Sequence, residues 1–239
     1  MKISLVIPMY NESSIITEAI ETFSSYMARR FEDWELIFVD DGSSDGCGDP
    51  VLAANERDGR IRLCRYTPNR GKGHAVRTGV LAEKGDIILF TDCDNAYGEE
   101  AIGRLADAVA EPGVDIVVGS RNLSKDGYEG YNFVRKLASK AYIKVISVAA
   151  GFRLSDSQCG FKGFRGEIAK RIFSNCEVDR FAFDLEVILI ANKLGASIKE
   201  IPVKIINHRE STVHVLSDSF KMLRDVRRMK KRIKKQEIR

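Results

Sequence analysis

Short apolar runs alternate along the first half of the chain with segments whose apolar residues recur every three or four positions. The runs predict buried strands at Ile3–Pro8, Leu36–Val39, Ile61–Tyr66, Ile87–Phe90 and Val114–Val118. The helical spacing predicts amphipathic helices over about 15–27, 72–82 and 99–110. Such alternation predicts an α/β fold with a mostly parallel central sheet flanked by helices, and ligands at the carboxyl ends of the strands.

The second half of the chain has a different pattern. Residues 122–132 are polar, rich in Gly and Tyr and without a period, and are interpreted as a mobile loop. Helices are expected at about 133–150, 166–175 and 184–194, with short strands near 162–164 and 198–205. We find no internal repeat or linker, and therefore expect one domain over 1–213, in halves of about 1–121 and 122–213, followed by a helix over 214–239.

The composition is that of an ordinary soluble globular protein, with 44% hydrophobic and 30% charged residues. Its five cysteines are scattered, odd in number and never in Cys-x-x-Cys spacing. This argues against a disulfide framework and against a zinc site, and fits a reducing compartment. No apolar run approaches the roughly 20 residues of a membrane-spanning helix, and the first residues do not form a signal peptide, so we expect a chain that does not cross a membrane by itself.

Positive charge is concentrated at the C-terminal end. Ten Lys or Arg against two acids give residues 221–239 a net charge of +8, which leaves −4 on the rest of a chain whose total is +4. Apolar residues also recur there at helical spacing: Phe220, Leu223, Val226, Met229 and Ile233. A solvated, frayed helix, a helix on an anionic membrane surface and a helix packed on a partner all fit this pattern. Nucleic-acid binding would also fit the charge, but the sequence contains no groove-reading or stacking motif that supports it.

The strongest chemical signal is Thr91-Asp92-Cys93-Asp94, which directly follows the apolar run Ile87–Phe90. Two closely spaced carboxylates at the carboxyl end of a buried strand suit a hard divalent cation. An Asp-x-Asp pair also occurs in ordinary turns, so this pair gains weight only from the segments around it.

Three further polar segments each follow a predicted strand: Pro8–Glu12, Asp40–Gly46 and Asn69–Arg77. The first also fits turn chemistry with a helix cap at Asn11 or Ser13, and the second also fits a plain Asp/Gly/Ser loop. Adjacent acids such as Asp40 and Asp41 repel each other unless something donates to them, and a nucleobase N–H or ribose hydroxyl can do so. In the third segment the helix start at Lys72 favours an anion such as diphosphate.

The glycines of the third segment exclude two common nucleotide-binding motifs. Gly71 and Gly73 do not belong to a Gly-x-Gly-x-x-Gly fingerprint, because Val76 occupies the last glycine position, and no Walker lysine follows a correctly spaced glycine. His74 and the two other histidines lack metal-ligand spacing, and we treat them as structural or surface residues.

Taken together and in order, these four segments resemble the family 2 glycosyltransferases of the GT-A fold, a Rossmann-like fold that binds a nucleotide-sugar. Downstream, Asp156–Lys162 and Phe181–Glu186 resemble the polyprenyl-phosphate sugar transferases, most of all the dolichyl-phosphate glucosyltransferases. The resemblance covers about residues 3–213, and it makes residues 1–121 the donor half and residues 122–213 the acceptor half.

The resemblance implies roles for particular residues. The nucleotide-sugar side comprises Pro8, Tyr10, Glu12, Asp40, Asp41, Lys72 and Asp92. The catalytic and acceptor side comprises Asp94, Arg121, Asp156, Gln158, Asp184 and Arg209. Asp92 and Asp94 would hold Mg²⁺ or Mn²⁺ on the diphosphate, and Arg121 would face a phosphate. Cys93 and Asn95 depart from the frequent Asp-Ala-Asp-Gly.

A second departure concerns the acceptor. Glu210-Ser211-Thr212 stands where relatives often carry Gly-Ser-Lys, which leaves Arg209 as the substitute for the missing lysine. We also expect a chain in the cytoplasm, peripheral on the cytoplasmic face of a membrane. Relatives frequently carry membrane helices that we do not find in this sequence, so the basic C-terminal segment would meet the lipid directly or bind a small membrane-spanning partner.

The expected activity is inverting transfer of a hexose to a polyprenyl phosphate, dolichyl or undecaprenyl. UDP-glucose is the favoured donor, other UDP-hexoses come next, and GDP-mannose after those. Two alternatives remain open. One is transfer to a saccharide or protein hydroxyl, with Asp184 or Asp156 as the base. The other is a non-catalytic subunit that binds a nucleotide-sugar.

Overall fold

The computed structural model describes residues 1–127, 154–180, 182–207 and 226–237. The strands are β1 Ile3–Met9, β2 Trp34–Asp40, β3 Ile61–Arg65, β4 Ile87–Phe90, β5 Ile116–Ser120, β6 Lys162–Arg165 and β7 Ile198–Pro202. The helices are α1 Ile16–Arg30, α2 Gly48–Arg57, α3 Lys72–Ala82, α4 Glu99–Ala110, α6 Gly166–Ser174 and α7 Phe183–Lys193. Residues 226–235 form a further helix near the C-terminus, which we call the tail helix.

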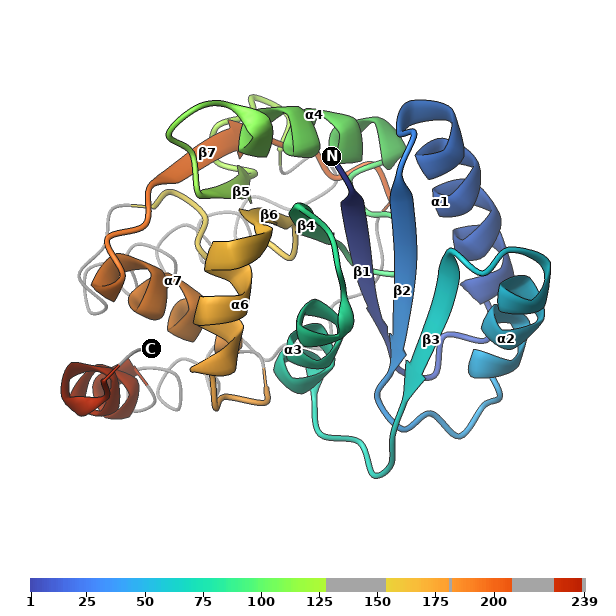
Figure 1. The fold of residues 1–239 in the computed structure, drawn as a ribbon, viewed down its shortest axis with the longest axis horizontal. Coiled ribbons are helices and arrows are strands. Elements are labelled where there is room, and N and C mark those ends of the chain that lie inside the picture. The colour runs from blue at the N-terminus through green and yellow to red at the C-terminus, as the bar shows by residue number, and fades with distance from the viewer. Residues whose placement is uncertain (128–153, 181, 208–225, 238–239) are drawn as a thin grey trace.

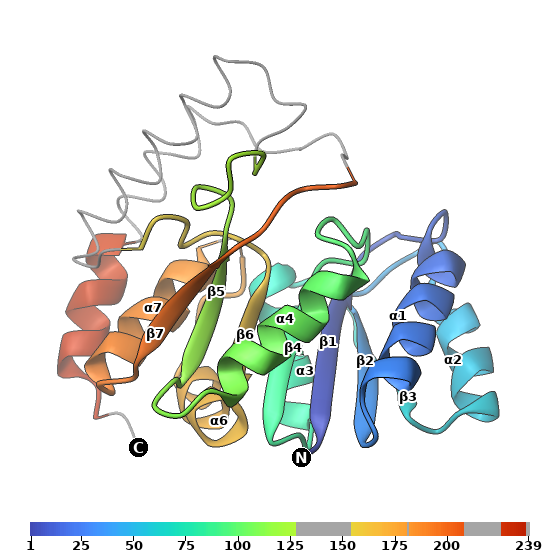
Figure 2. The same cartoon turned by 90° about the horizontal axis from the view of Figure 1, so that it is seen from above.

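These strands form one seven-stranded sheet in the order β3-β2-β1-β4-β6-β5-β7. β1 pairs in parallel with β2 and β4, β2 with β3, and β5 with β7. β6 is inserted between β4 and β5 and runs antiparallel to both. The helices α1, α2 and α4 lie against one face of the sheet, and α3, α6 and α7 against the other (Figures 1 and 2). The predicted α/β fold with a mostly parallel sheet is confirmed.

The strand register brings the polar loops to one edge of the sheet. Met9 pairs with Asp40, so the first two strands end side by side. Phe90, the last residue of β4, pairs with Lys162, and Lys162 pairs on its other side with Val118. Because β6 is antiparallel, its first residue lies beside the last residues of its neighbours. We call this side of the sheet the carboxyl edge.

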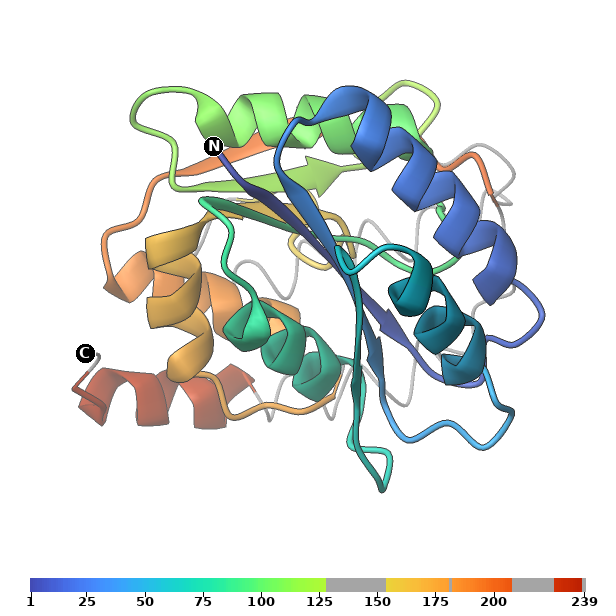
Figure 3. The same ribbon diagram turned by 45° about the vertical axis from the view of Figure 1, so that its right-hand side comes forward.

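Burial explains why the apolar runs form the centre of the sheet. Every residue of β2, β4 and β5 is buried, as expected for strands covered by helices on both faces. α1 and α4 lie side by side on their face (Figure 3), where the Arg30 guanidinium donates to both Asp107 oxygens at 2.7 and 2.9 Å.

The sequence prediction needs several corrections. It missed α2, and it did not foresee that β6 is antiparallel or lies between β4 and β5. It also placed the end of β7 at residue 205, whereas this strand ends at Pro202. The bounds of α3 and α4 match the prediction residue for residue. The expected helix at 133–150 and residues 128–132 of the expected 122–132 loop lie outside the described residues.

The tail helix packs on its own domain. Its apolar side chains Val226, Met229 and Ile233 are at most 4% exposed and belong to the hydrophobic core. The predicted apolar stripe therefore covers the domain itself here, and not a bilayer; Phe220 and Leu223 lie outside the described residues. In the part of the chain that the structure describes, every helix is too short or too polar to cross a membrane.

Candidate functional site at the carboxyl edge

The loops that leave β1 and β2 are joined by hydrogen bonds. The Asn11 side-chain oxygen accepts the Ser44 N–H at 2.9 Å, and Ser43 Oγ accepts the Asn11 N–H at 3.0 Å. The Asp45 carboxylate accepts the Ser13 N–H at 2.8 Å. Asn11 adopts a positive φ of 54°, which Asn tolerates better than most residues. Neither Asn11 nor Ser13 caps α1, which begins without a side-chain cap, so the capping alternative is wrong.

This joined pair of loops carries the residues expected at a nucleobase. Tyr10 is 49% exposed, which leaves an aromatic ring available for stacking. Pro8 is half-buried at the end of β1, and Glu12 is half-buried, with its backbone oxygen accepting the N–H groups of Ile15 and Ile16. Tyr10 is therefore the exposed member of the predicted base-binding group.

Asp41 receives its hydrogen bonds from the protein itself. Its carboxylate, only 3% exposed, accepts from Tyr66 Oη at 2.7 Å and from the Asn69 amide at 2.9 Å. It also accepts the backbone N–H groups of Arg70 at 2.8 Å and Gly71 at 2.7 Å. The donors for which the sequence suggested a nucleotide are thus supplied by residues 66–71. Asp41 shapes the loop in front of α3.

Asp40 is fixed in a similar way. It is 1% exposed and accepts the Arg65 Nε–H at 2.8 Å and the Ser43 N–H at 2.8 Å. Burial and the hydrogen bond to Asp41 raise the pKa of the Tyr66 phenol, which keeps Tyr66 a neutral donor. Each of the two adjacent carboxylates is therefore stabilised by hydrogen bonds from its own set of donors.

Lys72, at the start of α3, lies among acidic groups. Its ammonium group binds Asp92 Oδ1. Burial lowers the pKa of Lys72, but the negative charges of Asp92, Asp184 and Asp94 outweigh burial and raise it above its usual value. The structure thus brings Lys72, Asp92, Asp94 and Asp184 into one electrostatic cluster, although they come from the start of α3, the loop after β4 and the first turn of α7.

Asp92 and Asp94 have the chemistry of a divalent-cation site. Both follow β4 at the carboxyl edge, and Asp94 also accepts the Ala96 N–H at 3.1 Å. A Cβ at Gly160 would lie 2.7 Å from Asp92 Oδ2, so a side chain at this position would displace that carboxylate. No cluster of three or more His, Cys, Asp or Glu ligands occurs among the described residues. Two carboxylates nevertheless suffice for Mg²⁺, which takes its remaining ligands from substrate phosphates and water. The residues fit such an ion.

Asp184, in the first turn of α7, pairs with Lys162. The Lys162 ammonium group also donates to the Cys159 carbonyl at 2.6 Å. Burial raises the pKa of Asp184, against the opposing effect of Lys162 and Lys72. The sequence motif contained Lys162 without giving it a role, and its pairing was missed because Lys162 and Asp184 belong to different elements.

Arg121 and Asp156, both predicted as site residues, bind each other. The guanidinium donates to both carboxylate oxygens of fully buried Asp156, at 2.6 and 2.8 Å, and the Arg121 N–H adds a third bond at 3.1 Å. Glu200 of β7 accepts the N–H groups of Ser155 and Asp156 at 2.9 and 3.2 Å, and thereby fixes the same loop. No sequence motif pointed to Glu200. Gln158 is half-buried in this loop, and Arg209 lies outside the described residues.

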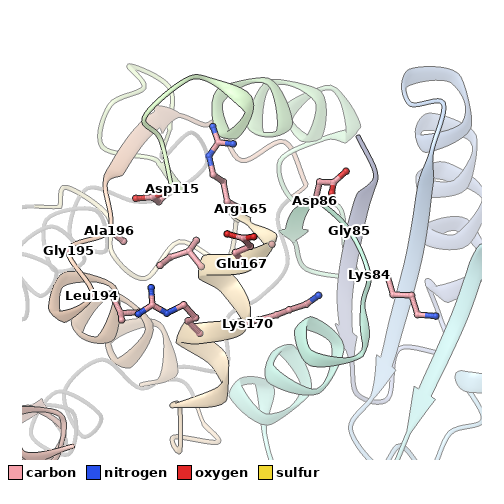
Figure 4. Close-up of a pocket in the computed structure, with 13 residues that line it drawn as sticks. Lys84, Gly85, Asp86, Asp115, Arg165, Glu167, Lys170, Leu194, Gly195 and Ala196 are labelled. Carbon is pink, nitrogen blue, oxygen red and sulfur yellow. The ribbon is translucent and has the colours of Figure 1, made fainter. Parts of the chain in front are cut away.

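A separate cavity of about 640 Å³ opens on the opposite edge of the sheet. Figure 4 shows its lining, in which basic and acidic side chains are mixed: Lys84, Asp86, Asp115, Arg165, Lys170 and Arg171. None of the predicted site residues lines it. Figure 2 shows the loops after β1, β4 and β5 on the other edge of the sheet, where the carboxylate cluster lies. The candidate site is therefore at the carboxyl edge and not in this cavity.

Known proteins resemble this chain in sequence. The family model described as "Glycosyl transferase family 2" matches residues 4–173. A dolichyl-phosphate beta-glucosyltransferase of Trichomonas vaginalis is 32% identical over 237 residues, covering 95% of this chain and 72% of the relative. A protein of the same name from Dictyostelium discoideum is 31% identical over 240 residues, covering 95% of this chain and 73% of the relative.

Solved structures share the fold. Glucosyl-3-phosphoglycerate synthase from Mycobacterium tuberculosis, in complex with UDP, superposes with a TM-score of 0.68 at 21% identity, over 99% of this chain and 81% of that protein. The same synthase in complex with Mn²⁺, UDP-glucose and phosphoglyceric acid gives the same TM-score, identity and coverage.

Proposed function

The chain belongs to glycosyl transferase family 2 and is a glycosyltransferase, and from this premise we propose that it transfers glucose from UDP-glucose to a polyprenyl phosphate such as dolichyl phosphate. The observation that carries the proposal is the cluster of Lys72, Asp92, Asp94 and Asp184 at the carboxyl edge. The names of the relatives support glucose and the lipid phosphate.

The donor half binds the nucleotide-sugar. Tyr10 stacks on the base, and Asp40 and Asp41 hold the surrounding loops in shape. A bound Mg²⁺ or Mn²⁺, held by Asp92 and Asp94, would offset negative charge on the departing diphosphate as a Lewis acid. In the protein alone Lys72 neutralises Asp92, and in the complex it stabilises negative charge at the diphosphate.

The acceptor half needs to do little more than place the acceptor phosphate beside the sugar. A phosphate monoester is ionised near neutral pH, with a second pKa of about 6, so its oxygen attacks the anomeric carbon without a strong general base. Attack opposite to the departing diphosphate inverts the configuration. Arg121 carries positive charge at this side of the site, and its pair with Asp156 fixes the orientation of the guanidinium group.

A hydroxyl acceptor is the second candidate, and one observation favours it. Burial raises the pKa of Asp184, as a general base at a hydroxyl requires. The pairing of Asp184 with Lys162 weighs against this role, because the ammonium group occupies a carboxylate oxygen. Asp156, the other predicted base, is bound on both oxygens by Arg121.

The tail helix supplies a surface for an anionic membrane. Its apolar side is buried against the domain, and its outer side exposes six cations: Arg227, Arg228, Lys230, Lys231, Lys234 and Lys235. Basic residues near an anionic lipid surface contribute about 1 kcal/mol each. We therefore propose peripheral attachment through charge, on the cytoplasmic face, with a small membrane-spanning partner as the alternative.

Transfer of radiolabel tests the proposal. The protein is incubated with labelled UDP-glucose, other UDP-hexoses or GDP-mannose, and with a polyprenyl phosphate, in Mn²⁺ or in EDTA. We expect label in the organic phase from UDP-glucose, in Mn²⁺ only. Label on a water-soluble saccharide or on protein would favour the hydroxyl acceptor. An absence of both products, with and without anionic vesicles, would contradict the proposed transfer.

A further inference from the structure

The first turn of α7 contains a second acid, Glu186, whose hydrogen bonds in the described part of the chain go to Glu177, Val178 and Arg232 and not to the carboxylate cluster described above. This side chain has no exposed surface. Its oxygens accept the backbone N–H groups of Glu177, at 3.0 and 3.1 Å, and Val178, at 2.8 Å. Glu186 therefore holds the segment between α6 and α7, residues 176–180, against the start of α7.

The tail helix completes this arrangement. The Arg232 guanidinium binds Glu186 with one nitrogen and Glu177 Oε2, at 2.7 Å, with the other. Gln236 donates to Asn175 Oδ1 at 3.2 Å. Figures 1 and 3 show the tail helix beside α6 and α7. A single arginine thus joins the tail helix to both α7 and the 176–180 segment.

The 176–180 segment in turn lies against the start of α3. Asp179 accepts from the Arg70 and Arg77 guanidinium groups at 3.1 and 2.9 Å, and its backbone oxygen accepts the His74 N–H at 3.1 Å. The backbones approach closely, since a Cβ at Gly71 would lie 2.7 Å from the Asp179 oxygen. Lys72 stands between these anchored positions and binds Asp92.

We propose that Arg232 is a positioning residue for the diphosphate side of the site: by holding Glu186 and the 176–180 segment, it fixes the start of α3 and thereby the place of Lys72 opposite Asp92. The inference rests on the proposed nucleotide site, and it deepens that proposal by making donor binding depend on the docked tail helix. The same helix exposes the basic surface proposed to meet the membrane, so the two faces of one helix serve attachment and donor binding.

The test compares Arg232→Ala and Arg232→Lys with a matched control, Arg62→Ala. Arg62 is a partly exposed arginine that binds a buried acid, Glu35, at 2.9 Å, as Arg232 binds Glu186, but it does so at the opposite edge of the sheet. Two quantities are measured in the full-length protein: UDP affinity in Mn²⁺ by calorimetry, and hydrogen exchange at the amides of residues 70–77 and 176–180.

We expect Arg232→Ala to weaken UDP binding about tenfold and to speed exchange at Val178 and His74, with a smaller effect of Arg232→Lys and none of Arg62→Ala. Unchanged UDP affinity and unchanged exchange at His74 would overturn the inference, even if exchange at Val178 rises. Should Arg232→Ala not fold, Arg232→Lys decides, because lysine keeps the charge but cannot bridge two carboxylates as the guanidinium fork does.

The exchange measurement separates this inference from the proposed function. If the wild-type protein does not bind UDP, the proposed nucleotide site is wrong, and exchange at His74 alone decides whether Arg232 positions the start of α3. If the wild-type protein binds UDP but transfers no label to the lipid, the proposed acceptor is wrong. UDP affinity and hydrogen exchange at His74 then still test the role of Arg232.

Discussion

Lys162 of β6 binds Asp184 of α7 where neither side chain has more than 8% of its surface exposed. The pair connects the central sheet to the helix whose first turn lies at the carboxylate cluster. Each charge is tolerated in this buried place only because the other is present.

Replacing one residue of this pair should therefore lower the free energy of unfolding more than replacing both residues. We expect Lys162→Met to lower the free energy of unfolding by about 3–5 kcal/mol, because buried Asp184 loses the ammonium group that binds it. The double variant Lys162→Met/Asp184→Leu should regain a large part of that loss. Urea denaturation of the two variants measures this, and a double variant less stable than Lys162→Met would contradict the argument.

Asp94 is expected to matter for transfer and not for folding. Asp94→Asn should reduce glucosyl transfer at least about 100-fold, the scale on which a charge-stabilising group acts, with an unchanged melting temperature. The control is Asp107→Asn, which alters an exposed carboxylate on α4. Wild-type turnover in Asp94→Asn would remove Asp94 from the proposed metal site.

Asp41 is expected to be structural. Asp41→Ala leaves the N–H groups of Arg70 and Gly71 without their acceptor, so the free energy of unfolding should fall by about 2–4 kcal/mol. Asp49→Ala, which removes an exposed acid from the neighbouring α2, should change stability far less. Unaltered stability in Asp41→Ala, together with lost UDP affinity, would restore the direct nucleotide contact that the sequence suggested.

Asp45 should make stability depend on pH. Burial would raise its pKa, but the N–H groups of Ser13 and Cys47 outweigh burial and lower the pKa of Asp45 to about 2. Its ordinary value is about 3.9. A folded-state pKa below the unfolded value gives stability that is complete above about pH 4 and is lost as the pH falls towards about 2. The stability difference between wild type and Asp45→Asn should narrow as the pH falls from about 4 towards 2 in chemical denaturation, whereas parallel curves would disprove the linkage.

Charge on the tail helix should govern binding to anionic vesicles. Replacing Lys230, Lys231, Lys234 and Lys235 by Ala should weaken binding to phosphatidylserine-containing vesicles at least about 100-fold, from about 1 kcal/mol per basic residue. The matched control replaces four exposed cations elsewhere by Ala: Arg57, Lys84, Arg104 and Arg171. Equal losses in the two variants would mean that binding follows total charge and not this surface.

The local pattern of apolar and polar residues was sufficient to predict most helices and strands. The bounds of α3 and α4 were predictable because Gly71 and Gly98, both at positive φ, directly precede the two helices, and α4 also has a strong apolar stripe. α2 was missed because, besides the Gly48 at its start, only Val51 and Ala54 of its ten residues are buried, which leaves too weak a period. The direction of β6 could not be predicted from four residues, since it depends on the path of the chain before them.

In the candidate site, too, local sequence predicted the position of residues but not their distant partners. Motif spacing placed Asp92, Asp94 and Lys72 correctly at one edge of the sheet, because each follows the end of a strand. What binds each acid depends on residues far away in the sequence: Asp41 is held by residues 66–71, and Asp156 by Arg121. The sequence motifs identified these acids but not their partners. We therefore expected a ligand to make hydrogen bonds that the protein itself makes.

The antiparallel direction of β6 has a consequence for how this architecture diversifies. The chain leaves the sheet after Ser120 and re-enters it at Lys162 on the same edge, where the Gly119 N–H and the Phe161 carbonyl are joined at 2.8 Å. The chain therefore leaves and rejoins the sheet at one place on the carboxyl edge. A change in the length of chain between these two points need not alter the strand order, so the proposed acceptor side can vary beside a constant sheet.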